Sequence, residues 1–149
     1  MADWGSAYER LGLDVARYLA ARGVVRDPED DQQAPGDLPA VVLGQLHELE
    51  GGEAVGVIGP WEVTRDLTDS NPVVRFVIVL RSEPWDYDGL AALTKAVFGS
   101  LHRRERFSLT AEQSVETSER IVSDPPTQDQ NRRWLRAETY QLRLRVPTT

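Results

Sequence analysis

The sequence predicts an α+β fold, in which two main helices pack on one face of a mostly antiparallel or mixed sheet. Three observations predict it. Apolar residues recur at helical spacing over residues 3–22 and again over residues 86–102. Runs of β-branched and apolar residues, separated by Gly and Pro turns, occupy most of the remaining chain. The 149 residues fit one domain, 1–149, with no internal repeat and no linker.

The N-terminal part of the chain predicts a helix and then an acidic loop. The apolar face of the helix is expected to hold Trp4, Tyr8, Leu11, Val15, Tyr18 and Leu19. Gly23 is a typical C-terminal stop, while Gly12 weakens the helix slightly. A short strand is expected at 24–26. Residues 27–37 lack apolar periodicity, so they predict an exposed acidic loop that includes Glu29, Asp30 and Asp31.

The middle of the chain predicts the centre of the sheet. Strands are expected at 40–46, 54–58 and 61–66, with a break at Gly59-Pro60. The run 73–81 is apolar on both faces apart from Arg75, which is typical of a central strand. Its core face is expected to hold Val74, Phe76, Ile78 and Leu80, packed against Leu93, Val97 and Leu101 of the second helix.

The last third predicts the second helix and the strands that complete the sheet. Asp86 or Asp88 is expected to cap helix 86–102, and His102, Arg103 and Arg104 are expected in its last turn. Short strands are expected at 107–110 and 118–123, and a long one at 134–146 with Tyr140, Leu142, Leu144 and Val146 facing the core. The acidic loop and the polar loop 124–131 lack apolar anchors, so we expect both to be mobile, partner-facing segments.

The composition excludes several chemistries. There is no cysteine and there are only two histidines, which excludes disulfides, thiolate catalysis and Cys- or three-His zinc sites. No P-loop, Gly-x-Gly-x-x-Gly or Gly-x-Ser-x-Gly motif occurs. The Asp86-Tyr87-Asp88 sequence is better explained by helix capping than by metal binding. The sequence therefore predicts no enzyme activity, no cofactor and no metal.

The charge is acidic overall and unevenly distributed. The net charge is −7, but residues 1–75 carry 6 basic and 14 acidic groups, and residues 76–149 carry 11 basic and 10 acidic groups. An acidic chain is a poor nucleic-acid binder, so no sequence-specific nucleic-acid partner is expected. No apolar run approaches the length of a membrane span, so no membrane partner is expected. The asymmetry has two explanations, a solvated surface or head-to-tail packing of identical subunits.

The order of these segments resembles a known family. An amphipathic helix and an acidic loop come first, then an apolar strand that ends in Arg81-Ser82 and leads directly into the Leu-rich helix. The closing segment carries Pro126, Asp129, Arg136, Thr139, Tyr140 and Leu142. This arrangement is similar, over nearly the whole chain, to the tail terminator (minor capsid, tail-completion) proteins of long non-contractile-tailed bacteriophages.

The resemblance implies a structural virion protein. Such a subunit forms a homo-hexameric ring that caps the tail tube, stops its polymerisation and joins the tail to the connector of the neck. It is assembled in the host cytoplasm and resides in the virion, where the genome can pass through the ring. Its partners would be itself, the tail tube protein and the head–tail connector. The alternatives are a head-completion or head–tail joining connector, a small ligand-binding or enzymatic domain, and a protein-binding regulator.

Charge and aromatic content predict where such subunits meet. An acidic edge that includes Glu29, Asp30 and Asp31 is expected to contact basic residues of the next copy. Some of these basic residues follow the second helix, and the others follow Asp129. These basic residues are Arg103, Arg104, Arg106, Arg132 and Arg133. Exposed ion pairs contribute about 0–1 kcal/mol each, so apolar burial must supply the affinity. Trp61 and Trp85, each beside a proline, are the candidate anchors.

Overall fold

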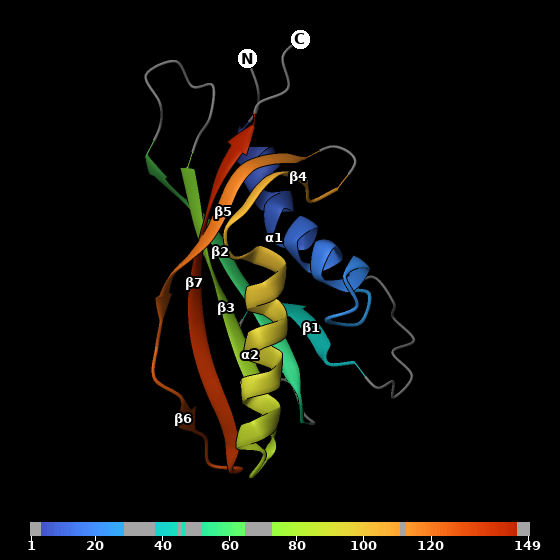
Figure 1. The fold of residues 1–149 in the computed structure, drawn as a ribbon, viewed down its shortest axis with the longest axis vertical. Helices are drawn as coiled ribbons and strands as arrows, with labels where there is room; N and C mark the ends of the chain where they lie inside the picture. The colour runs from blue at the N-terminus through green and yellow to red at the C-terminus, as the bar shows by residue number, and fades with distance from the viewer. Residues whose placement is uncertain are drawn as a thin grey trace.

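The computed structural model shows a mixed sheet of seven strands with two helices packed on one face (Figure 1). It describes residues 4–28, 38–44, 46, 52–64, 73–110 and 113–145. In chain order the elements of this part are α1 (Trp4–Ala21), β1 (Ala40–Leu43), β2 (Ala54–Thr64), β3 (Val73–Pro84), α2 (Tyr87–Leu101), β4 (Arg104–Ser108), β5 (Ser114–Ser123), β6 (Thr127–Gln128) and β7 (Arg133–Arg145). The predicted α+β class is confirmed.

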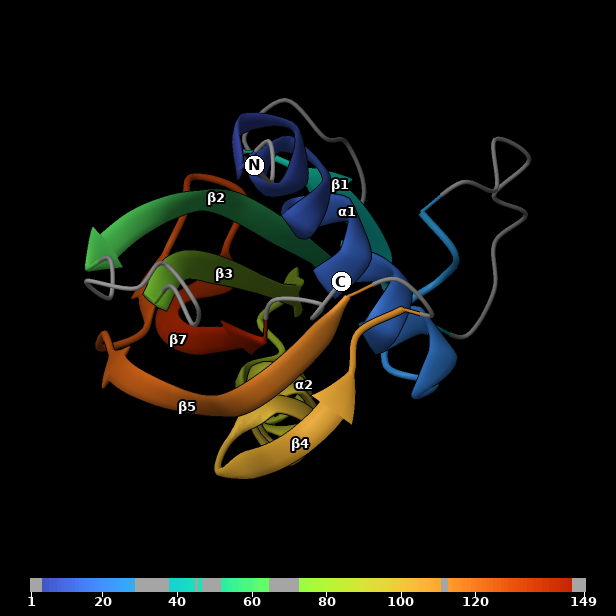
Figure 2. The same cartoon turned by 90° about the horizontal axis from the view of Figure 1, so that it is seen from above.

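The sheet is antiparallel except at one edge. Its strand order is β1-β2-β3-β7-β5-β4, β6 pairs with β7, and only β1 and β2 run parallel among the described pairs. Seen from above, the sheet curves, with β2 at one side and β5 and β4 at the other (Figure 2). The start of α1 and the end of β7 lie at one end of the molecule, and the β3–α2 and β6–β7 turns lie at the opposite end (Figure 1).

The central strand is β3, as the sequence predicts. It pairs with β2 on one side and with β7 on the other. Its predicted core residues are buried in one cluster with the predicted residues of α2: Val74, Phe76, Ile78, Leu80, Leu93, Val97 and Leu101. The Phe76 ring stacks on Tyr140 of β7, with centroids 6.0 Å apart. Tyr140, Leu142 and Leu144 are buried, whereas Val146 lies outside the described residues.

The two helices begin and end where local chemistry directs. The Asp86 side chain accepts a hydrogen bond of 2.9 Å from the Gly89 N–H, so it caps α2 as predicted. Gly23 follows α1 with a φ of 75°, a conformation that favours glycine. Gly12 lies against β2: a Cβ there would sit 3.2 Å from the Gly59 carbonyl oxygen. This close approach explains why a weak helix former stands inside α1.

Several predicted element boundaries were wrong because strand pairing overrides local composition. Strand β2 continues through Gly59-Pro60, and an irregularity between Ile58 and Trp61 keeps it paired with β3. Residues 24–26 form no strand, although Val24 and Val25 are buried. Helix α2 ends at Leu101, and Arg104 begins β4 instead of completing the helix. Strands β4 and β5 start earlier than predicted, because they pair with each other. Arg104 pairs with Ser118, and Ser108 pairs with Ser114.

Candidate functional site

The end of the molecule formed by the β3–α2 and β6–β7 turns carries an exposed tryptophan. Trp85 is 71% exposed and has a φ of 63°, in the left-handed region that a bulky residue rarely adopts. Its backbone N–H donates a 2.8 Å hydrogen bond to the Arg132 carbonyl, and the Arg132 guanidinium carbon lies 5.4 Å from the centre of the indole ring. Arg132 has a φ of 64°. The two contacting residues therefore both have a strained backbone conformation, which persists only where the surrounding structure enforces it.

Two further aromatic residues extend this surface. Tyr87, 46% exposed, packs edge-on against Trp134 with ring centroids 5.2 Å apart. The backbone N–H of Trp134 donates to the Ser82 hydroxyl at 3.0 Å, which joins the start of β7 to the end of β3. We call Trp85, Tyr87, Arg132 and Trp134 the aromatic tip. Sequence reasoning selected Trp85 and Arg132 but missed Tyr87 and Trp134, because only the pairing of β3 with β7 brings the two turns together.

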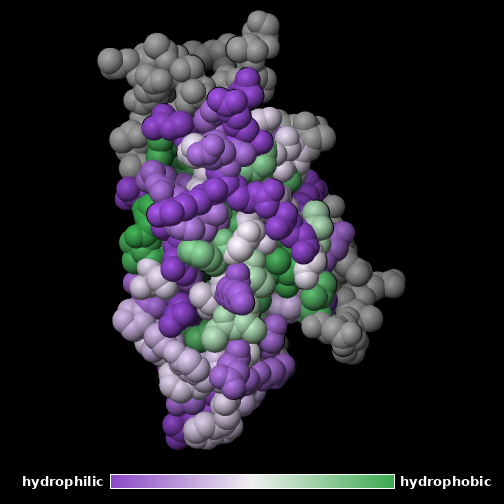
Figure 3. Space-filling model, viewed as in Figure 1, coloured by the Kyte–Doolittle hydropathy of each residue, from purple (hydrophilic) through white to green (hydrophobic). Residues whose placement is uncertain are grey.

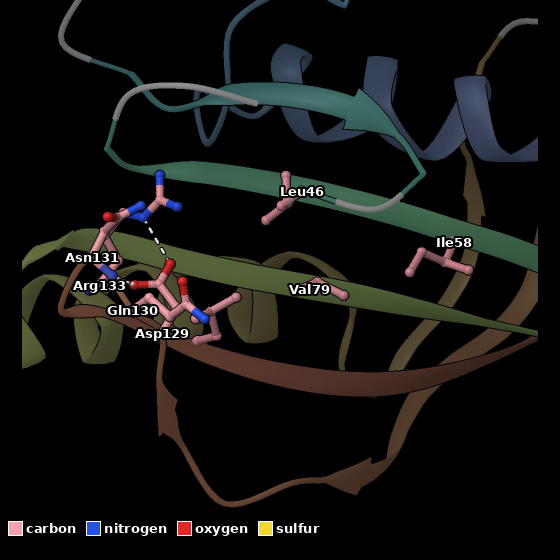
Figure 4. Close-up of a pocket in the computed structure, with 8 residues that line it drawn as sticks. Leu46, Ile58, Val79, Asp129, Gln130, Asn131 and Arg133 are labelled. Carbon is pink, nitrogen blue, oxygen red and sulfur yellow. Dashed lines mark hydrogen bonds and ion pairs between the residues drawn. The ribbon is translucent and has the colours of Figure 1, made fainter. Parts of the chain in front are cut away.

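Asp129 and Arg133 organise the β6–β7 turn. One Asp129 oxygen accepts hydrogen bonds of 2.9 Å from the N–H groups of Asn131 and Arg133, and the other lies 2.8 Å from the Arg133 Nε (Figure 4). Burial alone would raise the pKa of Asp129, but the hydrogen bonds and charge of Arg133 hold it below its ordinary value. The predicted interface residues Asp129 and Arg133 thus compensate each other's charge within one chain. The segment 124–131, predicted as a polar loop, contains the short strand β6, which pairs with β7, so its assignment as loop throughout was wrong.

Replacing Asp129 by Asn should flatten the acid side of the stability profile. Because the folded-state pKa is lowered, Asp129 stabilises the fold above its unfolded-state pKa of about 3.9, and this contribution is lost as the pH falls below it. We therefore expect the free energies of unfolding of wild type and Asp129→Asn to differ at pH 7 and to converge below about pH 4. Urea titrations at several pH values measure this. Asp124→Asn, an exposed carboxylate in the same loop, serves as the control and should leave the profile unchanged.

Arg81 and Ser82, which carry part of the resemblance, have structural roles. Arg81 is only 1% exposed, and its guanidinium donates to the carbonyl oxygens of Gly52 at 2.8 Å and Leu46 at 3.0 Å. Burial and the charge of Arg133 lower the pKa of Arg81. The side chain therefore joins the end of β3 to the segment that precedes β2. Ser82 is fully buried and bonds β7.

A pocket of about 450 Å³ lies on the sheet beside this turn (Figure 4). Leu46, Ile58, Val79 and Leu135 form its apolar part. The ion pair of Asp129 and Arg133 stands at one end. Since these charged groups are bonded to each other, the described lining of the pocket offers an apolar floor and no acid–base pair aimed into it.

Four other predicted interface residues, Trp61, Arg103, Arg104 and Arg106, lie away from the aromatic tip. Trp61, 43% exposed, is paired with Arg75 near the start of β3, whereas Trp85 follows the end of that strand. Arg103 is exposed. Arg104 lies over the Phe107 ring at 5.5 Å, and Arg106 is 3.5 Å from Glu116. Glu29, Asp30 and Asp31 lie outside the described residues.

The part of the chain that the structure describes contains few side chains placed for catalysis or metal binding. No group of three or more His, Asp or Glu side chains there is placed to hold a metal ion. The His102 ring stacks on Phe98 and its Nδ1 accepts the Arg120 N–H at 3.1 Å. Burial and the neighbouring charges of Arg103 and Arg120 lower the pKa of His102. His47 lies outside the described residues. None of the described helices is long and apolar enough to span a membrane.

Comparison with known proteins shows a likeness of fold. No family model matches the chain, and no curated protein matches it. Among solved structures, a chain in the virion of a native gene transfer agent (GTA) particle is similar, with a TM-score of 0.56 at 16% sequence identity. The likeness covers 94% of this chain and 93% of the other. Over nearly its whole length, this chain therefore shares its α+β fold with a chain found in that virion.

Proposed function

We propose that this protein is a structural protein of a phage-like virion and acts as a tail terminator. In this role six copies form a ring that caps the tail tube, stops its polymerisation and joins the tail to the connector of the neck. The observation that carries the proposal is the fold shared with a virion chain over 94% of this chain and 93% of the other. The segment order, which resembles tail terminators, supports the specific role.

The described surface suits a subunit whose work is assembly. The aromatic tip exposes Trp85 and Tyr87 beside Arg132, and these three residue types dominate the binding energy of protein interfaces. The charged groups of the pocket, Asp129 and Arg133, are bonded to each other and serve the β6–β7 turn. The proposal accordingly includes no catalytic step, no cofactor and no metal.

Assembly of the tail tube tests the proposal. Purified tail tube protein of the same particle is polymerised with and without this protein, and tube lengths are measured by electron microscopy. We expect tubes to elongate without a defined length when the protein is absent, and to stop and carry a ring at one end when it is present. Native mass spectrometry should give a complex of six times the 16.7 kDa monomer.

The alternative neck role has a different outcome in the same experiment. A head–tail joining connector would leave tube elongation unchanged and would bind the connector complex of the head instead. That result would contradict the terminator role and leave the virion role in place. If the protein bound neither the tube nor the head complex, the virion role would be wrong.

A further inference from the structure

The aromatic tip has the build of an anchor for another protein surface. Trp85 is 71% exposed, its backbone N–H is bonded to the Arg132 carbonyl, and the Arg132 guanidinium lies over the indole ring and restricts it. Such fixed side chains lose little conformational entropy on binding. Strained backbone positions persist where the surrounding structure enforces them, and they cluster at functional sites. Trp85 and Arg132 are two such positions in direct contact.

The surface around the anchor is acidic. Glu83 and Asp88 are exposed on either side of Trp85, and Asp86 caps α2. The Glu83 carboxylate accepts the backbone N–H of Glu53 at 3.4 Å, and burial together with the negative charges of Glu83 and Asp86 raises the pKa of Glu53. A partner surface for the tip should therefore combine room for an indole ring with positive charge.

A groove on the same chain has these two properties. It lies between the C-terminal end of α1 and the outer face of α2, with a volume of about 500 Å³. Its lining includes Arg22, Gly23, Ala92, Lys95, Ala96 and Gly99. Figure 3 shows this face, where pale and green atoms lie among the purple ones between the two helices.

The groove is positively charged and open. Arg22 and the single lysine of the chain, Lys95, are both exposed, and the described lining includes no acidic residue. Neither cation has an ion-pair partner among the described residues. A Cβ added at Gly99 would meet no atom within 4 Å, so the floor leaves room for an inserted side chain.

We propose that the aromatic tip of one copy docks into the groove of the next copy. Trp85 would lie over the small residues of α2, and Glu83 and Asp88, which border the tip, would face Arg22 and Lys95. Tip and groove are different surfaces, so the contact is heterologous, the type from which closed rings are built. The inference rests on the proposed ring function, for which it names the subunit contact.

Two complementary charge variants test the contact. The tip variant carries Glu83→Lys and Asp88→Lys, and the groove variant carries Arg22→Glu and Lys95→Glu. In either variant alone, the tip and the groove have the same sign of charge, so we expect neither to form hexamers. In a mixture, each tip meets a groove of opposite charge, and we expect rings that contain three copies of each. Native mass spectrometry identifies these rings by mass, and circular dichroism confirms that both variants are folded.

The two exposed tryptophans provide a matched comparison. Trp85→Ala should raise the protein concentration at which half of the chains are assembled by about tenfold or more, the effect of losing an aromatic hot spot. Trp61→Ala removes an indole that is 43% exposed elsewhere on the surface and should leave this concentration unchanged. The triple variant Arg103→Glu, Arg104→Glu and Arg106→Glu tests the contact expected from the charge pattern of the sequence. If the tip and the groove form the contact instead, this variant should also form hexamers.

The outcomes separate the contact from the function. If the variants with altered tip or groove formed hexamers alone, or their mixture formed none, the proposed contact would be wrong while the ring function stood. The proposed contact would also be wrong if the triple arginine variant formed no hexamers while the groove variant alone still formed them. A wild-type protein that stayed monomeric even on tail tubes would contradict both the contact and the ring.

Discussion

Replacement of Phe76 by Ala should lower the free energy of unfolding by about 3–5 kcal/mol. The Phe76 side chain is 1% exposed at the centre of the sheet, stacked on Tyr140 of β7 and enclosed by the core that α2 covers. Truncation removes its buried apolar surface and leaves a cavity that a sheet strand paired on both sides cannot close. Since a domain of this kind has a total stability of about 5–15 kcal/mol, the loss should be visible in a urea titration.

Val122→Ala provides the control for that measurement. Val122 is on β5 and is 47% exposed, so its truncation should change the free energy of unfolding by about 0.5 kcal/mol or less. If the slope of the unfolding free energy against urea concentration is the same in the variant and the wild type, a shifted midpoint reports a change in stability. A changed slope would report a change in the unfolded state. If Phe76→Ala melted like the wild type, the assignment of β3 to the core would be wrong.

Replacement of Arg120 by Met should lower the free energy of unfolding by a similar amount, about 3–5 kcal/mol. The Glu138 side chain is fully buried, and one of its oxygens lies 3.0 Å from the Arg120 guanidinium. Its other oxygen has no hydrogen-bond partner among the described residues. Arg120 also lies over the Phe98 ring at 4.3 Å, which encloses the pair beneath α2. Loss of the arginine would leave a buried carboxylate without a counter-charge.

A double variant distinguishes this cause from simple loss of packing. Arg120→Met combined with Glu138→Leu replaces the whole pair by apolar side chains, and such replacements are often neutral or stabilising. We expect the double variant to recover most of the stability that Arg120→Met loses. A double variant that is as unstable as the sum of two independent losses would show that the ion pair is not the cause.

Elements with a strong local pattern were predicted well from the sequence. The two helices occupy nearly their expected ranges, because apolar spacing, Asp86 and Gly23 act within one or two turns of the chain. The core face of β3 was predicted for a similar reason: an uninterrupted apolar run has only one suitable place in a sheet, the centre.

Elements whose structure depends on a partner strand were predicted less well. Gly59-Pro60 has the composition of a break, yet β2 passes through it because β3 supplies hydrogen bonds on both sides of the irregularity. Loop 124–131 has a polar composition, but β7 pairs with β6 and Asp129 bonds the turn. In both places the secondary structure depends on hydrogen bonds to another strand, and the local composition of one segment carries no information about that pairing.

For the candidate site, too, some features could be predicted from the sequence and others could not. The sequence by itself determined the α+β class, the two helices, the central strand and the choice of Trp85 and Arg132 as surface residues, because residue type and local spacing carry that information. Only the tertiary structure decided that Trp85, Tyr87, Arg132 and Trp134 form one surface, and that Arg133 is buried against Asp129. The physical reason is the antiparallel pairing of β3 with β7, which brings two distant turns to one end of the sheet.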